Sequence, residues 1–332
     1  MVLTRQITPK EESRNPLKPL SLVSMRKFER RLGLPRATLQ EIAEQCDSYY
    51  MPRADEKPLQ PFAHVKKNPK IRLLDCPQGP LKEVQRRIYR TLLRDLELPE
   101  YLCGGVKGHS VLDNVALHAG ESLIVTIDIK SWFPSITSND VHFVWYTVLK
   151  CSREIADLLT SLTTFNGHLP QGSPASMALS NLVLYSIDLP IRRAAASLGV
   201  NYSCWVDDLV FSGENARRMI PVVKSTLKVA GFKISQPKLK VMGTTKQKVI
   251  NGIIPGRKPS IPKQTRERIR SALHHLRVKN ICEQVPMGKL LVQDVERYIA
   301  TQKGKLAYFR NVNPQQTRLL EEELLLLQQK TN

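Results

Sequence analysis

Acidic residues are scarce in this chain of 332 residues. It has 30 aspartates and glutamates against 50 lysines and arginines, a formal net charge of +20 at pH 7. A positive excess of this size indicates a polyanionic partner, with nucleic acid the first candidate and an anionic membrane surface the second. No apolar run approaches the roughly 20 residues that a membrane-spanning helix needs, which favours nucleic acid. The first ten residues also lack the apolar core of a signal peptide.

Cysteine pairs are missing as well. The six cysteines lie far apart, at positions 46, 76, 103, 151, 204 and 282, with no Cys-x-x-Cys and no neighbouring histidine cluster. This spacing excludes a zinc knuckle and offers no disulfide framework. The sequence therefore predicts a reduced, cytoplasmic protein.

Two apolar segments each carry carboxylates where a strand ends. The β-branched run 122–130 holds Asp128, and the segment 202–213 reads as a hairpin with Asp207 and Asp208 at its tip. Taken alone, an Asp-Asp pair is most often an ordinary turn. A lone carboxylate on a buried strand is costly unless it has a partner, so the three together predict a site. Oxygen ligands of this kind suit Mg²⁺.

The order of the expected elements is that of an α+β protein. Helices are expected at 25–32 and 81–98, and one long helix between Pro174 and Gly199 with the proline in its first position. A short strand is expected at 249–254. Strand, helices, hairpin, helix and strand fit the β-α-β-β-α-β order of a ferredoxin-like sheet, which would place Asp128 beside the hairpin tip.

Most of the positive excess lies in the last third of the chain. Residues 238–310 contain 17 lysines and arginines and 4 acidic residues, a net charge of +13. Within this segment 264–276 predicts a helix with Ile269, Leu273 and Leu276 on one stripe and arginines, among them Arg266 and Arg270, on the other. The alternatives are a solvated basic face and a face that follows a phosphate backbone, and we favour the second.

These motifs together resemble the reverse transcriptases, and among them the bacterial retron type. The matching residues occur in the family's order: Arg72, Asn114, His118, Asp128 in Asp-Ile-Lys-Ser-Trp-Phe-Pro-Ser-Ile, Leu-Pro-Gln-Gly-Ser-Pro at 169–174, Asn181, Val-Asp-Asp at 206–208, and Lys238. The resemblance implies a right-hand polymerase fold with fingers, a ferredoxin-like palm and a helical thumb. It implies an N-terminal arm and helix at 1–37, fingers at 38–121, a palm at 122–254 and a thumb at 255–332.

The resemblance also assigns the carboxylates. Asp128 and Asp207 would bind two Mg²⁺ ions, for which Mn²⁺ could substitute, and Asp208 would be the third catalytic carboxylate. The backbone carbonyl of Ile129 could complete the metal shell.

Five further residues match positions around the incoming nucleotide. Phe133 would exclude ribonucleotides, Gln171 and Gly172 would lie beside the nucleotide, Arg72 would grip the triphosphate and Lys238 would assist pyrophosphate departure, with Lys240 a close competitor. Read without the family, these are a core aromatic residue, an ordinary turn and solvated charges.

Two segments match the retron type in part and make RNA-recognition candidates. Asn114 and His118 keep the ends of an Asn-Ala-x-x-His motif, for which the alternatives are a helix cap and a satisfied histidine. Asn251 and Gly252 stand in the Val-Thr-Gly position with only the glycine kept, and Arg266 and Arg270 of the basic helix complete the set. Trp205-Val206 before the aspartates also departs from the family's Tyr-Ala.

The function that the resemblance implies is an RNA-directed DNA polymerase. It would use dNTPs to copy a structured RNA into a covalently branched RNA–DNA, as part of a phage-defence system with a separate effector protein and no membrane partner. The alternatives are another bacterial reverse transcriptase, of the group II intron-like or abortive-infection kind, possibly with untemplated synthesis, and a non-catalytic RNA-binding protein.

Overall fold

The computed structural model describes residues 17–55, 72–278, 292–318 and 320–322. These residues form two compact units, one that comprises residues 17–54 and 73–247 and one that comprises the described residues from 248 onward. The family-derived boundaries at residues 37, 121 and 254 stay predictions.

A four-stranded antiparallel sheet organises the first unit. Its strands are β3 (Ile124–Asp128), β4 (Asn201–Trp205), β5 (Asp208–Ser212) and β6 (Lys240–Met242), in the order β4-β5-β3-β6. The central strand β3 pairs with β5 on one side and β6 on the other. This is the β-α-β-β-α-β order that the sequence predicts, and it places the Asp128 strand next to the Asp-Asp hairpin.

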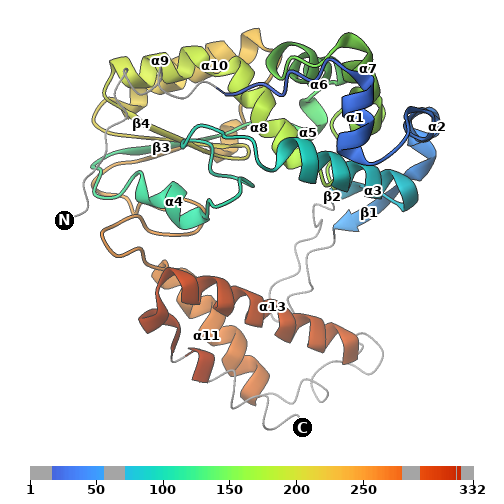
Figure 1. Cartoon of the computed structure of the whole chain (residues 1–332). Coiled ribbons are helices and arrows are strands. Elements are labelled where there is room, and N and C mark those ends of the chain that lie inside the picture. The colour runs from blue at the N-terminus through green and yellow to red at the C-terminus, as the bar shows by residue number, and fades with distance from the viewer. Residues whose placement is uncertain (1–16, 56–71, 279–291, 319, 323–332) are drawn as a thin grey trace. The chain divides into compact units, whose positions relative to one another are not determined.

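Helices surround this sheet and extend away from it. They are α1 (Met25–Leu32), α2 (Arg36–Glu44), α3 (Gly79–Ile88), α4 (Val111–Ala116), α5 (Trp132–Ser135), α6 (Ser138–Phe143), α7 (Arg153–Thr163), α8 (Ser176–Ile187), α9 (Leu189–Ser197) and α10 (Met219–Val229). Helices α9 and α10 lie over one face of the sheet and α4 lies on the other (Figure 1). A two-stranded sheet pairs β1 (Tyr50–Asp55) with β2 (Arg72–Pro77).

Two helix predictions are corrected by the structure. The helix expected over 81–98 spans α3 and then a π-helical turn at Tyr89–Leu93, where it ends. The long helix expected from Pro174 is two helices, because Pro190 has no N–H to continue α8 and instead occupies the first turn of α9. Pro174 itself lies in the turn before α8.

The second unit contains α11 (Lys263–Val278) and α13 (Val292–Val312). Ile269 and Leu273 are buried, which confirms that part of the predicted apolar stripe, whereas the side chain of Leu276 lies outside the described residues. The strand expected at 249–254 is wrong: Ile250 and Ile253 form an isolated bridge across a tight turn. No helix in the described part of the chain is long and apolar enough to cross a membrane.

Candidate active site

The three predicted carboxylates meet at one end of the sheet. Asp128 is the last residue of β3 and stands directly opposite Asp208, the first residue of β5. Asp207 precedes Asp208 in the β4–β5 turn, and its carbonyl accepts a hydrogen bond from the Ile129 N–H at 2.9 Å. Two adjacent strands and one turn therefore place three negative charges together.

The charges in this cluster act on one another. Partial burial and the neighbouring carboxylates Asp207 and Asp128 raise the pKa of Asp208 to about 6. Asp128 is only 4% exposed, and its Oδ2 receives the Lys238 ammonium at 2.5 Å. This hydrogen bond raises the pKa of Lys238. The cluster is thus an acidic site whose charge Lys238 and Lys240 partly neutralise, and a bound cation would relieve the remaining repulsion.

The turn that carries Asp207 has an unusual backbone. Val206 has φ +64°, in the left-handed region that a β-branched residue rarely adopts. Such a conformation costs about 1–3 kcal/mol and persists only where the surroundings enforce it. The surroundings here are the segment Tyr101–Gly104, which we call the strap.

The strap lies directly against the hairpin. The N–H of Cys103 donates to the carbonyl of Cys204 at 2.9 Å, and the N–H of Cys204 donates to the carbonyl of Tyr101 at 2.7 Å. A Cβ on Gly104 would lie 2.5 Å from the Val206 nitrogen, so only glycine permits this approach. Buried Asn181 fixes the strap from behind, because its Nδ2 donates to the Gly104 carbonyl at 2.8 Å.

The loop that carries Gln171 and Gly172 is held by a buried glutamine that the sequence did not single out. Gln85 of α3 is fully buried, and its Oε1 accepts the Ser173 hydroxyl at 2.6 Å. Gly172 has φ +133°, and a Cβ there would lie 3.0 Å from the Asp75 carbonyl oxygen of β2. The loop is therefore fixed between α3 and β2.

The other nucleotide-site candidates keep their assignments as predictions. Phe133 lies in α5, partly buried against the core, which fits both of its readings. Lys238 joins the acidic cluster through Asp128, whereas Lys240 begins β6. Arg72 begins β2, and its side chain lies outside the described residues.

The structure corrects the expectation that Asn114 and His118 contact RNA. Both side chains are completely buried. His118 Nδ1 lies 2.7 Å from the Ser212 hydroxyl and its Nε2 lies 2.7 Å from the Ser203 hydroxyl. The Ser203 hydroxyl in turn donates to Asn114 Oδ1 at 2.6 Å. The two residues tie α4 to strands β4 and β5 of the catalytic hairpin, and neither presents a surface to a ligand.

This network fixes the tautomer of His118. Because Ser203 donates its proton to Asn114, it must accept the Nε2–H of His118, which leaves Nδ1 to accept the Ser212 hydroxyl proton. A second ring proton, on Nδ1, would point at the Ser212 hydroxyl oxygen, which already accepts a hydrogen bond from Asn201 Nδ2 at 3.5 Å. Burial accordingly lowers the pKa of His118 to about 3.

A pH-dependent stability follows. The folded state resists protonation of His118 and the unfolded state does not, so the free energy of unfolding falls as the pH drops from about 6.5 towards 3. Between pH 7 and pH 5 the loss from this residue is about 2 kcal/mol. In urea unfolding, His118→Gln is expected to lack that part of the loss, whereas His142→Gln, in α6, retains it. Equal pH dependence in the wild type and His118→Gln would contradict the assignment.

The remaining RNA candidates lie in the second unit. Asn251 and Gly252 form the tight turn between Ile250 and Ile253, with φ values of +49° and +82°. Arg266 is half-buried on α11, and Arg270 is exposed one turn further along. Their contact with RNA stays a prediction.

The donor set of the acidic cluster fits a hard divalent cation, because carboxylate oxygens are the ligands that Mg²⁺ prefers. Among the residues that the structure describes, no three His, Cys, Asp or Glu side chains are arranged as a finished metal site. Burial, and after it the neighbouring carboxylates Asp207 and Asp128, raise the pKa of Asp208, so a bound cation would favour its ionised form.

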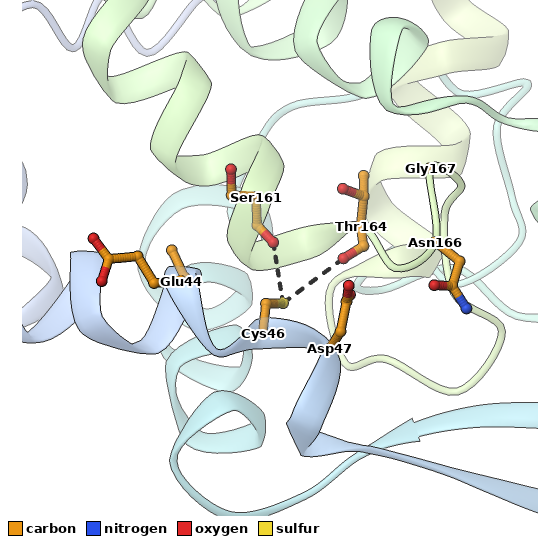
Figure 2. A pocket seen from close by; sticks show the side chains of 8 residues that line it. Glu44, Cys46, Asp47, Ser161, Thr164, Asn166 and Gly167 are labelled. Atoms are coloured by element: carbon orange, nitrogen blue, oxygen red, sulfur yellow. Dashed lines mark hydrogen bonds between the residues drawn. The ribbon is translucent and has the colours of Figure 1, made fainter.

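A separate cavity of about 230 Å³ lies between the end of α2 and the end of α7 (Figure 2). Cys46, which follows α2, lines this cavity, and its thiol donates to the Ser161 carbonyl of α7 at 3.1 Å. Burial raises the pKa of this thiol to about 12, so it stays protonated and is no nucleophile. The cavity shares no residue with the acidic cluster.

Comparison with known proteins agrees with this geometry. The family model described as reverse transcriptase (RNA-dependent DNA polymerase) matches residues 65–265. The chain is 30% identical over 217 residues to the retron Ec86 reverse transcriptase of Escherichia coli, covering 64% of this chain and 68% of that protein. It is 27% identical over 294 residues to the retron Mx65 reverse transcriptase of Myxococcus xanthus, covering 82% and 66%. It is 29% identical over 148 residues to the retron Se72 reverse transcriptase of Salmonella heidelberg, covering 45% and 39%.

Proposed function

Since the chain belongs to the reverse transcriptase family, and to its retron type, we propose that this RNA-directed DNA polymerase copies part of a structured RNA into a branched RNA–DNA. The observation that supports the chemistry is the acidic cluster, in which Asp128 and Asp208 face each other across two strands beside Asp207. The family generally uses divalent metal ions, which we propose to be Mg²⁺ here, with Mn²⁺ as a substitute. When bound, such ions would activate the primer hydroxyl and stabilise the leaving pyrophosphate.

The residues of this chain have proposed roles around that chemistry. Asp128 and Asp207, with the Ile129 carbonyl, would hold the metal ions, and Asp208 would supply the third negative charge. Lys238, which bonds Asp128 at 2.5 Å, is close enough to the cluster to donate a proton or a hydrogen bond to pyrophosphate. Gln171 and Gly172 would lie beside the nucleotide, on a loop that Gln85 fixes through its hydrogen bond with Ser173. A rigid loop of this kind favours correct positioning of the reacting groups.

The nucleic acid that co-purifies with the protein tests this function. We expect a species with an RNase-sensitive part and a DNase-sensitive part, joined at a 2′ branch. The Asp207→Asn variant, purified in the same way, is expected to carry the RNA without the DNA. RNA alone on the wild type would favour a non-catalytic RNA-binding protein, and DNA without a template sequence would favour an untemplated reverse transcriptase.

We further propose that the enzyme acts in phage defence with a separate effector protein, as the retron type suggests. Phage plating on cells that carry the chain with its neighbouring genes tests this role. Protection that persists in the Asp207→Asn strain would contradict a defence role for DNA synthesis.

A further inference from the structure

Two helices of the first unit present a dense row of cations that the polymerase site does not use. Helix α1 exposes four of them, Arg26, Lys27, Arg30 and Arg31, on the side opposite buried Phe28 and Leu32. The helical run of α3 and its π-helical turn exposes Arg86, Arg90 and Arg94 at four-residue spacing, so they follow one line along the surface. We call these seven residues the arginine face.

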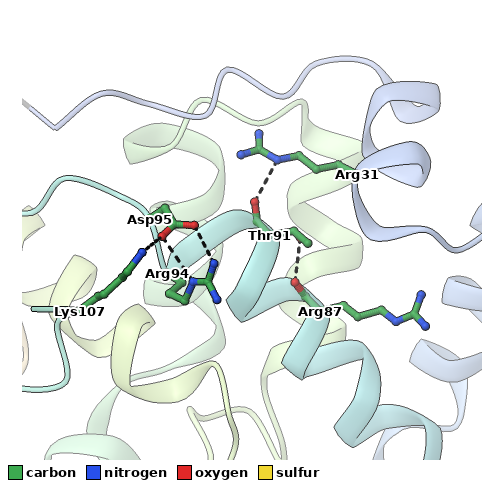
Figure 3. Close-up of polar contacts among 6 residues, drawn as sticks. All are labelled: Arg31, Arg87, Thr91, Arg94, Asp95 and Lys107. Carbon is green, nitrogen blue, oxygen red and sulfur yellow. Dashed lines mark hydrogen bonds and ion pairs between the residues drawn. The ribbon is translucent and has the colours of Figure 1, made fainter.

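Hydrogen bonds fix the two helices of the arginine face to each other (Figure 3). Arg31 Nε donates to the Thr91 carbonyl at 3.0 Å, and Thr91 Oγ1 donates to the Arg87 carbonyl at 2.8 Å. The Arg87 guanidinium donates to the carbonyls of Leu32 and Gly33, at 3.2 Å each, where α1 ends. The two helices that carry the cations are therefore held in a fixed arrangement before any ligand binds.

The protein itself neutralises little of this charge. Within the described residues, Arg26, Lys27, Arg30, Arg31 and Arg90 have no carboxylate at ion-pair distance, whereas Arg86 pairs with Glu83 at 3.7 Å and Arg94 with Asp95 at 3.3 Å. Asp95 is shared with Lys107 at 2.8 Å. Glu29, the acidic residue of α1, accepts the backbone N–H of Arg36 at 2.6 Å.

This arrangement is unfavourable for the helices alone. Arg26 and Lys27 occupy the first turn of α1, which has no acidic residue, and the positive end of the helix dipole disfavours cations there. Like-charged pairs at i,i+4, such as Arg86 with Arg90, also destabilise a helix. A polyanionic ligand would relieve this repulsion directly, whereas solvent and salt only screen it.

The chemistry of the face favours nucleic acid over a membrane surface. A helix that lies on a membrane offers large apolar residues to the acyl chains. The apolar residues of α1, Phe28 and Leu32, are instead 0% and 2% exposed in the core. Guanidinium groups with unused N–H donors suit the oxygens of successive phosphates.

We propose that the arginine face binds the phosphate backbone of a folded RNA segment, outside the part that is copied. This rests on the proposed function and adds a second RNA-binding surface, separate from the acidic cluster. The face would hold the RNA on the enzyme while the template end enters the site, so it contributes to RNA retention and not to nucleotide addition.

Two variants with equal charge test the proposal. The first changes Arg26, Lys27, Arg30 and Arg90 to Gln, all exposed residues without a side-chain hydrogen bond in the described structure. The control changes Arg217, Arg218, Lys224 and Lys228 to Gln, which are exposed on the segment that leads into and forms α10. Circular dichroism melting establishes that both remain folded.

Binding of a fluorescein-labelled RNA stem–loop is measured against salt concentration, with single-stranded DNA of equal length as a second probe. Removing four cations that contact phosphates is expected to reduce the magnitude of the slope of log K against log salt by about 3. It is also expected to weaken RNA binding at least ~10-fold. The control is expected to change RNA affinity less than about 2-fold, because its charges lie elsewhere. Equal losses in both variants, or no loss in the first, would overturn the proposal, and an equal loss of DNA binding would overturn its assignment to RNA.

Extension of a preannealed DNA primer on an RNA template separates this proposal from the proposed function. The first variant is expected to extend that primer at the wild-type rate once the complex is saturated. A wild type that extends no primer would contradict the polymerase, while the binding result on the arginine face would stand. A variant that binds RNA normally but extends slowly would overturn the arginine face as a retention surface.

Discussion

Replacing Asp207 or Asp128 with asparagine is expected to reduce primer extension on an RNA template by about 1,000-fold or more. Each 1.36 kcal/mol of lost transition-state stabilisation is a factor of ten in rate, and a catalytic metal ion contributes several kcal/mol. Asparagine keeps the size of the side chain and removes the charge that would hold the ion. Single-turnover extension in Mg²⁺ measures the loss, and Asp47→Asn, at an exposed aspartate away from the cluster, is the matched control.

The third carboxylate of the cluster, Asp208, is expected to lower the stability of the metal-free protein. The pKa of Asp208 is raised to about 6 by burial and by Asp207 and Asp128, so its ionisation opposes folding of the metal-free protein, in part from about pH 3.8 and fully above about pH 6. Asp208→Asn should therefore increase the free energy of unfolding at pH 7, by an amount of the order of 1 kcal/mol, since solvent screens part of the repulsion. Below about pH 3.8 the gain should vanish, because the carboxyl is then protonated in both states.

Thermal unfolding with and without Mg²⁺ joins these two expectations. The wild type should gain stability from the ion and the Asp207→Asn variant should gain much less. A variant that is inactive, as stable as the wild type and still stabilised by Mg²⁺ would show that the ion binds elsewhere. Persistent extension by the Asp207→Asn, Asp208→Asn double variant would remove the cluster from the chemistry altogether.

The parts of the site that the sequence predicts are those with local causes. The β-branched run ending at Asp128 and the short apolar strands around Asp207–Asp208 set their own backbone and alternation, and the topology then makes them neighbours. Burial, in contrast, depends on what packs over a residue. Nothing within Asn114-Val-Ala-Leu-His118 predicts its partners, which lie on strands about 90 residues away. Ser203 bonds both Asn114 and His118, and Ser212 bonds His118.

Long-range contacts explain the other residues that sequence reasoning missed. Asn181 bonds the carbonyl of Gly104, 77 residues earlier, and Gln85 bonds Ser173, 88 residues later. Asn181 stood in the ordered set of motifs without a role, and no motif marked Gly104. A glycine required by close approach carries no local pattern, because the atom that excludes a side chain belongs to a distant segment.

Substituting alanine for Gly104 is the second change with a large expected effect. The new Cβ would lie 2.5 Å from the Val206 nitrogen, 2.7 Å from Val206 Cγ2 and 3.0 Å from the Trp205 carbonyl carbon. Two of these atoms are backbone, so no side-chain rotation relieves the contact. The strap cannot move away easily. The Asn181 side chain donates to the Gly104 carbonyl, and the backbone N–H of Cys103 donates to the carbonyl of Cys204.

The hairpin must therefore move, and it carries Asp207. A displacement near 1 Å at a catalytic group can cost about 100-fold in rate, and overpacking of this kind costs about 1–3 kcal/mol in stability. We expect Gly104→Ala to fold with reduced stability, to bind an RNA–DNA primer-template as the wild type does, and to extend it about 100-fold more slowly.

Gly243→Ala is the matched control, because a Cβ at Gly243 meets no atom within 4 Å and its backbone is outside the left-handed region. Pre-steady-state extension at saturating primer-template separates a slow chemical step from weak binding. A normal rate with lowered stability would mean that the strap yields and the hairpin does not, and the strap would then support the fold without positioning Asp207. A slow rate that excess Mg²⁺ partly restores would instead indicate that the displaced aspartate still binds the ion, only more weakly, as expected of a positioning contact.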